Sequence, residues 1–196
     1  MNHSLPKPFT HLSADISEVL FTGEQIRQRV VELGQEITQD YGDSEPVLVG
    51  VLKGVLFFMS DLLRAISTPV VYDFLAVSSY SSEARSQGLV RLVKDLDFPI
   101  TGRDVIFVED VIDTGLTLNY LLRNLGERRP KSLEVCVLFN KPAHRLLEIP
   151  IKYKGFDLPD RFVVGYGLDY GERYRNLPFV GLLSGEAYER MLHRKV

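Results

Sequence analysis

The segment Val105–Thr117 constrains the fold more than any other part of this 196-residue chain. It begins with four apolar β-formers, Val105 to Val108, as in a strand that is buried on both faces of a parallel sheet. Glu109 and Asp110 follow directly, and the next residues lead into a helix whose leucines share one face. Open α/β sheets bind ligands at the carboxyl ends of their strands. The segment therefore predicts a strand, a turn and a helix with a ligand site at the turn.

The turn Asp113–Thr117 has the composition of an anion site. The first N–H groups of a helix lack partners within the helix and carry the positive end of its dipole. Gly115 lets the backbone approach a phosphate closely, and Thr114 and Thr117 add hydroxyl donors. Asp113 remains open at this point, because an N-cap and a general acid or base suit it equally well.

The acidic pair is expected to contact a different part of the ligand, because carboxylates repel a phosphate. Glu109 and Asp110 would instead face ribose hydroxyls or a bound divalent cation. A charged loop after a buried strand would explain an isolated Glu-Asp pair, but the complete segment favours a phosphorylated sugar as the ligand.

Helical and strand patterns alternate along the rest of the chain. Strands are expected at 46–51, 70–77, 104–108 and 133–139, and helices at about 26–37, 55–66 and 117–125. This order predicts a doubly wound, mostly parallel α/β sheet with helices on both faces. The polar segment 78–88 is expected to be a mobile loop over the substrate.

Composition narrows the class of protein. The chain is 45% hydrophobic and 25% charged, with a net charge of −3, which argues against nucleic-acid binding through overall charge. It has no apolar run long enough for a membrane span and no secretory signal at its start, so we expect a cytoplasmic protein. The single cysteine, Cys136, is expected in a buried strand. The spacing of the histidines does not suggest a transition-metal site, and His144 is expected at the surface.

The Val105–Thr117 segment resembles the phosphoribosyl-pyrophosphate (PRPP) signature of the type I phosphoribosyltransferases. Other motifs in the same order are similar to the hypoxanthine(-guanine) branch of that family: Leu52–Gly54, Ser78–Tyr80, Lys141–Pro142 and Phe162–Tyr170. The resemblance runs from about Leu52 to Arg175. It implies one domain over 1–196, with a core at about 20–140 and a small hood lobe from about 1–15 and 145–196.

The resemblance implies a magnesium-dependent transfer of the phosphoribosyl group from PRPP to hypoxanthine or guanine. Asp113 would be the catalytic acid or base beside the purine, and Glu109 and Asp110 would hold the ribose hydroxyls directly or through Mg²⁺. The 5′-phosphate would lie on the loop made of Asp113, Thr114, Gly115, Leu116 and Thr117.

The resemblance also implies roles for residues outside this segment. Pyrophosphate would be bound by Lys53, Gly54, Ser79, Tyr80 and Arg175, and the Leu52–Lys53 peptide is often cis in the family. The purine would be recognised by Lys141 at its 6-oxygen, by stacking on Phe162, by the backbone of Val163 and by Asp169, which would also help to hold the magnesium. Relatives are usually homodimers or homotetramers.

Three alternatives stay open. A regulatory protein could keep the fold and sense PRPP, and fold alone does not exclude it. A phospho-acceptor receiver domain also uses acidic residues at strand ends, although its acidic pair should follow the first strand. A transferase for xanthine or another base differs only in the purine pocket, where Asn140 and the Ala143–Arg145 segment depart from many relatives.

Overall fold

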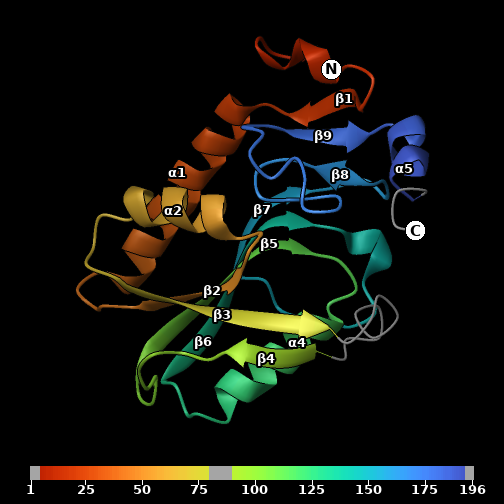
Figure 1. The fold of residues 1–196 in the computed structure, drawn as a ribbon. Coiled ribbons are helices and arrows are strands. Elements are labelled where there is room, and N and C mark those ends of the chain that lie inside the picture. Colours follow the sequence, from red (N-terminus) through yellow and green to blue (C-terminus); the bar gives the residue numbers. More distant parts are fainter. Residues whose placement is uncertain (1–4, 80–89, 193–196) are drawn as a thin grey trace. The chain divides into compact units, whose positions relative to one another are not determined.

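The computed structural model describes residues 5–79 and 90–192 (Figure 1). The chain forms two compact units, a central unit of Val30–Asp160 and a terminal unit of Met1–Arg29 and Arg161–Val196. The first boundary lies within helix α1 (Gly23–Tyr41). Residues 145–160, which the sequence assigned to the hood, belong to the central unit.

The central unit is built on a six-stranded sheet of order β4-β3-β2-β5-β6-β7. Its strands, in chain order, are β2 (Val47–Leu52), β3 (Val71–Ser79), β4 (Val90–Lys94), β5 (Asp104–Ile112), β6 (Ser132–Asn140) and β7 (Tyr153–Asp157). All neighbours are parallel except β3 and β4. The doubly wound, mostly parallel α/β fold expected from the sequence is therefore confirmed.

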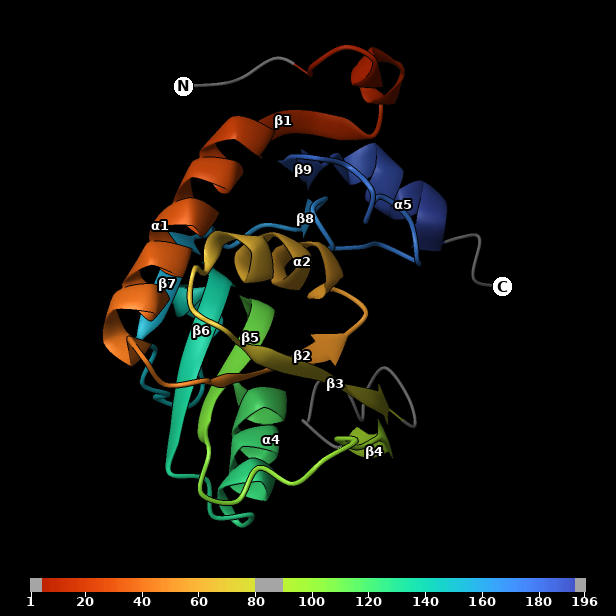
Figure 2. The ribbon, with the colours of Figure 1, turned by 90° about the vertical axis from the view of Figure 1, so that its left-hand side faces the viewer.

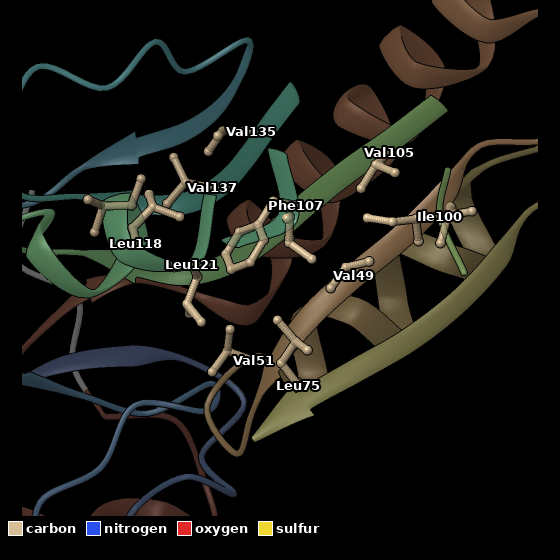
Figure 3. Close-up of a cluster of buried hydrophobic side chains, with 13 residues drawn as sticks. Val49, Val51, Leu75, Ile100, Val105, Phe107, Leu118, Leu121, Val135 and Val137 are labelled. Atoms are coloured by element: carbon tan, nitrogen blue, oxygen red, sulfur yellow. The ribbon is translucent and has the colours of Figure 1, made fainter. Parts of the chain in front are cut away.

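Helices α2 (Leu56–Ala65) and α4 (Leu116–Gly126) lie on opposite faces of this sheet (Figures 1 and 2). Side chains alternate between the faces along a strand. On β2, Val49 packs in the cluster that contains the α4 leucines (Figure 3), whereas a Cβ on Gly50 would meet Met59 of α2. Because both faces are covered, the strands are continuously apolar, which is why the sequence pattern identified them.

The core between the sheet and α4 is a continuous cluster of buried hydrophobic side chains. Figure 3 shows Phe107 of β5 at its centre, beside Leu121 of α4. Cys136, on β6, is fully buried, as expected.

The terminal unit contains a second, antiparallel sheet of order β1-β9-β8. Its elements are η1 (Phe9–Leu12), β1 (Ile16–Phe21), β8 (Val163–Val164), β9 (Val180–Leu183) and α5 (Gly185–Leu192). Ile16, Val164 and Phe179 share one buried cluster, and the ring of Phe9 packs edge-on against Phe179 at 5.6 Å. The two ends of the chain thus build one unit.

Three strand boundaries differ from the sequence prediction. Strand β3 continues past Val77 and pairs with β4 through Ser79, so the first two residues of the expected loop 78–88 are strand residues. Strand β5 continues past Val108 to Ile112, so the acidic pair lies within its last residues. The Phe162–Tyr166 part of the motif Phe162–Tyr170 also has the residue types of a strand, but it is a strand only at Val163–Val164. It ends there because Gly165 and Tyr166 adopt positive φ values of 105° and 48°, and Gly165 donates its N–H to the carbonyl of Leu168.

Within the described ranges 5–79 and 90–192, no helix combines the length and the apolar character that a membrane crossing requires.

Candidate active site

Three neighbouring parallel strands, β2, β5 and β6, each end immediately before a predicted site residue. Lys53 follows Leu52, Asp113 follows Ile112 and Lys141 follows Asn140. The last residues of β5 and β6 lie directly opposite each other in the register. The fold therefore brings these three residues to the carboxyl edge of one sheet, where α/β proteins bind ligands.

Gly54 lies directly against the acidic pair of β5. Gly54 is buried, and a Cβ built on it would overlap Oδ2 of Asp110. Only a residue without a side chain fits here without moving that carboxylate. The adjoining Leu52–Lys53 peptide is cis, as the resemblance implies.

The carboxylate of Glu109 is poorly solvated. Its Oε2 is buried and has no hydrogen-bond partner within residues 5–79 and 90–192. Burial, and then the neighbouring charge of Asp110, hold the pKa of Glu109 well above its ordinary value. An unsatisfied acceptor next to a second carboxylate is the environment that a cation or a ribose hydroxyl would satisfy.

The predicted phosphate loop begins at the end of β5 and leads into α4. The N-cap of α4 is Gly115, at φ +84°. Because glycine has no side chain, it does not cap the N–H groups of the first turn. The left-handed conformation explains why glycine stands here. Thr114 Oγ1 accepts a hydrogen bond from the Leu116 N–H at 3.4 Å, so the threonine hydroxyl lies at the helix end as expected. Both the N–H groups and the dipole of this end favour an anion.

Asp113 is not the N-cap of α4, because Gly115 occupies that position. Its side chain is 52% exposed, and its Oδ1 lies 2.8 Å from Nδ1 of His144. The same imidazole contacts the carboxylate of Asp160 through Nε2. His144 is at the surface, as predicted, but the sequence reasoning missed its contact with Asp113.

Lys141 stands between β6 and the short helix η2 (Pro142–His144). Its backbone N–H donates to the carbonyl of Ile112 at 2.9 Å, which ties the end of β6 to the end of β5. Asn140 is buried, donates to Asp157 at 2.5 Å and accepts a hydrogen bond from Arg145. Asn140 therefore fixes the backbone that precedes the predicted purine-binding lysine.

Four predicted site residues belong to the terminal unit. Phe162 is 42% exposed and packs edge-on against Tyr170 at 5.1 Å between ring centroids, and Val163 is buried in β8. Asp169 forms an ion pair with Arg175 at 2.8 Å. The rings and charges that the resemblance assigns to purine and pyrophosphate are thus held by contacts within this unit.

The remaining predictions concern the polar loop. Ser79 is the last residue of β3, whereas Tyr80 and residues 81–88 lie outside the described residues. Within the described part of the chain, no group of three or more His, Cys, Asp or Glu side chains is arranged to hold a metal by itself.

Comparison with known proteins places the chain in a family. The phosphoribosyl transferase domain family matches residues 18–171. A hypoxanthine-guanine phosphoribosyltransferase from Mycobacterium avium is 52% identical over 182 residues, covering 90% of each chain. One from Bacillus subtilis is 49% identical over 175 residues and covers 89% of this chain and 97% of its own.

A solved structure agrees with these sequence matches. A hypoxanthine phosphoribosyltransferase from Staphylococcus aureus has a TM-score of 0.88 at 44% identity, covering 93% of this chain and 99% of its own. With the family motifs at the carboxyl edge of the expected sheet, the chain belongs to the phosphoribosyltransferase family, in the group of the hypoxanthine-guanine phosphoribosyltransferases, and is a transferase.

Proposed function

We propose that this protein transfers the phosphoribosyl group of PRPP to hypoxanthine or guanine in a magnesium-dependent reaction of purine salvage. The products would be IMP or GMP and pyrophosphate. The observation that carries the proposal is the placement of Lys53, Asp113 and Lys141 at the ends of three adjacent parallel strands. The relatives named above as hypoxanthine-guanine phosphoribosyltransferases support it.

The phosphate and ribose of PRPP would bind along β5 and the start of α4. The loop Asp113–Thr117 supplies the helix end, the Gly115 turn and the Thr114 hydroxyl for the 5′-phosphate. Glu109 and Asp110 would engage the ribose hydroxyls, and the buried, unpartnered Oε2 of Glu109 supports this role.

Magnesium fits the same acidic pair. Adjacent carboxylates are ligands that Mg²⁺ prefers, and this ion is usually held by one or two protein carboxylates together with substrate phosphates. Glu109 and Asp110 would hold it at the ribose, and Asp169 is proposed as a further ligand for pyrophosphate-bound magnesium. When bound, the ion would offset the negative charge of the pyrophosphate.

Asp113 would act as the general base. A ring nitrogen of the purine forms a bond to the anomeric carbon while the bond from that carbon to pyrophosphate breaks. The proton that the purine loses passes to an oxygen of the Asp113 carboxylate. The exposed side chain of Asp113 at the strand end supports this assignment, because a base must be within reach of a bound purine.

Base specificity would come from Lys141. An ammonium group donates hydrogen bonds only, so it favours a 6-oxo group and disfavours the 6-amino group of adenine, which also donates. Phe162 would stack on the purine, and Val163 would contact it through its backbone. Lys53, Gly54, Ser79, Tyr80 and Arg175 are proposed for pyrophosphate.

Assembly and location are predictions of the same kind. We propose a homodimer or homotetramer in the cytoplasm. In a related hypoxanthine phosphoribosyl transferase from Trypanosoma cruzi, the C-terminal region has a role in the oligomeric state and the enzymatic activity of that protein.

The test is product formation from PRPP and Mg²⁺ with hypoxanthine, guanine, xanthine and adenine assayed separately, each nucleotide being identified by chromatography. We expect IMP and GMP with stoichiometric pyrophosphate, little product from adenine, and none from Asp113→Asn on the same time scale. Preferential turnover of xanthine would reassign the base. PRPP binding without turnover of any base would favour the alternative of a ligand sensor.

A further inference from the structure

His144 stands between two carboxylates of the central unit. Its Nδ1 lies 2.8 Å from Oδ1 of Asp113, and its Nε2 contacts Oδ1 of Asp160. The imidazole is 41% exposed. Nothing in the reaction described above requires this histidine, so its position needs a separate explanation.

One carboxylate lies at each ring nitrogen of His144, so the number of N–H donors on the ring decides how many hydrogen bonds it can form. A neutral imidazole has one N–H donor and one acceptor nitrogen, and the acceptor would face a carboxylate oxygen without a hydrogen bond. Only the doubly protonated imidazolium donates to Asp113 and Asp160 together. Both contacts are therefore hydrogen bonds when the ring carries both protons.

The backbone holds the imidazole against Asp113 from both sides. Before His144, the N–H of Lys141 donates to Ile112, the residue preceding Asp113; after it, the N–H of Leu146 donates to Thr114, the residue following Asp113, at 3.0 Å. The segment that carries the histidine is thus hydrogen-bonded to both neighbours of the aspartate. These bonds hold the two backbone segments together, so the side chains of His144 and Asp113 are within reach of each other.

The charge of Arg145 also acts on this cluster. Arg145 donates to the carboxamide of Asn140, and its guanidinium charge also interacts with Asp113. Burial lowers the pKa of Arg145, and the charge of Asp113 opposes that change. Among the described residues, the charged groups that these contacts link to the imidazole or to Asp113 are Asp113, Asp160 and Arg145.

We propose that His144 is a positioning residue for the general base. Its Nδ1–H engages Oδ1 of Asp113 and leaves Oδ2 as the oxygen that receives the purine proton. Asp160 orients the ring through Nε2. This inference rests on the proposed function, because it gives His144 its role through Asp113.

The proposal has a signature that a purely structural contact lacks. Below neutral pH, the imidazolium opposes protonation of the Asp113 carboxylate. Removing it should move the acid side of the kcat–pH profile to higher pH. It should also lower kcat about three- to tenfold near neutral pH, because the base is less well placed. The KM for PRPP should change less than about twofold, because the phosphate loop is untouched.

The first experiment measures kcat and KM from pH 5 to 9 for His144→Ala, His144→Arg and the wild type. Arginine keeps a permanent positive charge at the position, so we expect it to restore the acid side of the profile. His11→Ala is the matched control, because His11 belongs to the terminal unit and its ring contacts the carbonyl of Pro8. A His144→Ala profile that superimposes on the wild type would overturn the proposal.

The second experiment does not depend on activity. The imidazole resonances of His144, assigned by their loss in His144→Ala, are titrated by NMR in the wild type, in Asp113→Asn and in Asp160→Asn. Each asparagine should move the titration of His144 to lower pH, because each removes an anion that favours the imidazolium. No response to Asp113→Asn overturns the proposal whatever the assay gives, whereas an inactive wild type with a normal NMR response would contradict the proposed function alone.

Discussion

Gly54 and Asp110 are packed so closely that a methyl group on the glycine would occupy the position of the aspartate's Oδ2. One residue lies just beyond the end of β2 and the other near the end of β5, so the contact joins two parallel neighbours at the carboxyl edge of the sheet. The carboxylate of Asp110 thus lies directly against the backbone of Gly54. Any residue larger than glycine must displace the carboxylate.

Gly54→Ala should therefore damage substrate binding more than folding. We expect kcat/KM for PRPP to fall about tenfold or more, because misplacing a binding group by about 1 Å can cost that much. The matched control is Gly126→Ala at the end of α4, where an added Cβ meets nothing within 4 Å. The measurement is steady-state kinetics with PRPP as the varied substrate. Equal values of kcat/KM for the two variants would show that the close approach of Gly54 to Asp110 is unimportant for binding.

Asp113→Asn should separate chemistry from binding. The amide keeps the size of the side chain but cannot accept the purine proton, so kcat should fall by about 10² or more. The helix end formed by Gly115 is unchanged, so the Kd for PRPP, measured by calorimetry, should stay within about threefold. Turnover close to that of the wild type would remove Asp113 from the mechanism.

Lys141→Met should relax the choice of base. The thioether keeps the length and apolar stem of lysine but loses the donor to the 6-oxygen. We expect kcat/KM for hypoxanthine to fall about 10- to 100-fold while the value for adenine falls much less. Lys131→Ala is the control, since Lys131 pairs with Asp104 at the start of β5. A uniform loss for both bases would argue against a contact with the 6-oxygen.

The carboxyl edge of the sheet could be predicted from the sequence because apolar runs mark buried strands. Lys53 directly follows such a run, and the order of strands and helices fixes the parallel arrangement. The end of β5 was predicted too early, since Glu109 and Asp110 break the apolar pattern while the backbone pairing with β6 continues to Ile112. Ladder hydrogen bonds depend on the backbone, so polarity alone does not end a strand.

The contact of His144 with Asp113 lay beyond this reasoning for a different reason. The two residues are 31 positions apart and meet only because hydrogen bonds of Lys141 and Leu146 place one loop against the other. The terminal sheet is a similar case, since β1 pairs with β9 from the opposite end of the chain. Neither pairing leaves a local pattern in the sequence.

Asp73 should contribute to stability in a pH-dependent way. Burial by itself raises its pKa, but hydrogen bonds from the N–H groups of Asp97 and Phe74 and from the Lys94 ammonium hold the pKa below its ordinary value. A lowered pKa in the folded state means stability that is present above the unfolded pKa of about 4 and is lost as the pH falls below it. Asp73→Asn should cost about 1–3 kcal/mol at pH 7 and clearly less at pH 3.5.

Urea unfolding of both proteins at the two pH values measures this difference. Asp61→Asn is the control, because the pair of Asp61 with Arg64 is at the surface and such pairs contribute little. An equal loss at both pH values would mean that the charge of Asp73 is irrelevant and only its shape matters.

The contribution of Glu109 to stability should depend on pH in the opposite direction to that of Asp73. It should also show that this carboxylate serves function at the expense of stability. Its pKa is raised by burial and by the charge of Asp110, so the folded protein holds a proton that the unfolded chain releases. Stability is then lost as the pH rises from the unfolded pKa of about 4.3 towards the folded value. Glu109→Gln removes this loss, so the variant should exceed the wild type in free energy of unfolding at pH 8 in EDTA by about 1 kcal/mol or more.

The gain should disappear near pH 4, where Glu109 is protonated in both states, and Glu148→Gln, at an exposed position, should show no gain at either pH. Saturating Mg²⁺ and PRPP should stabilise the wild type more than the variant, because ligands that bind the folded carboxylate add to its stability. A glutamine variant less stable than the wild type at pH 8 in EDTA would contradict this account. The expected pattern would mean that the carboxylate is kept at a cost to the empty protein because the bound substrate requires its charge.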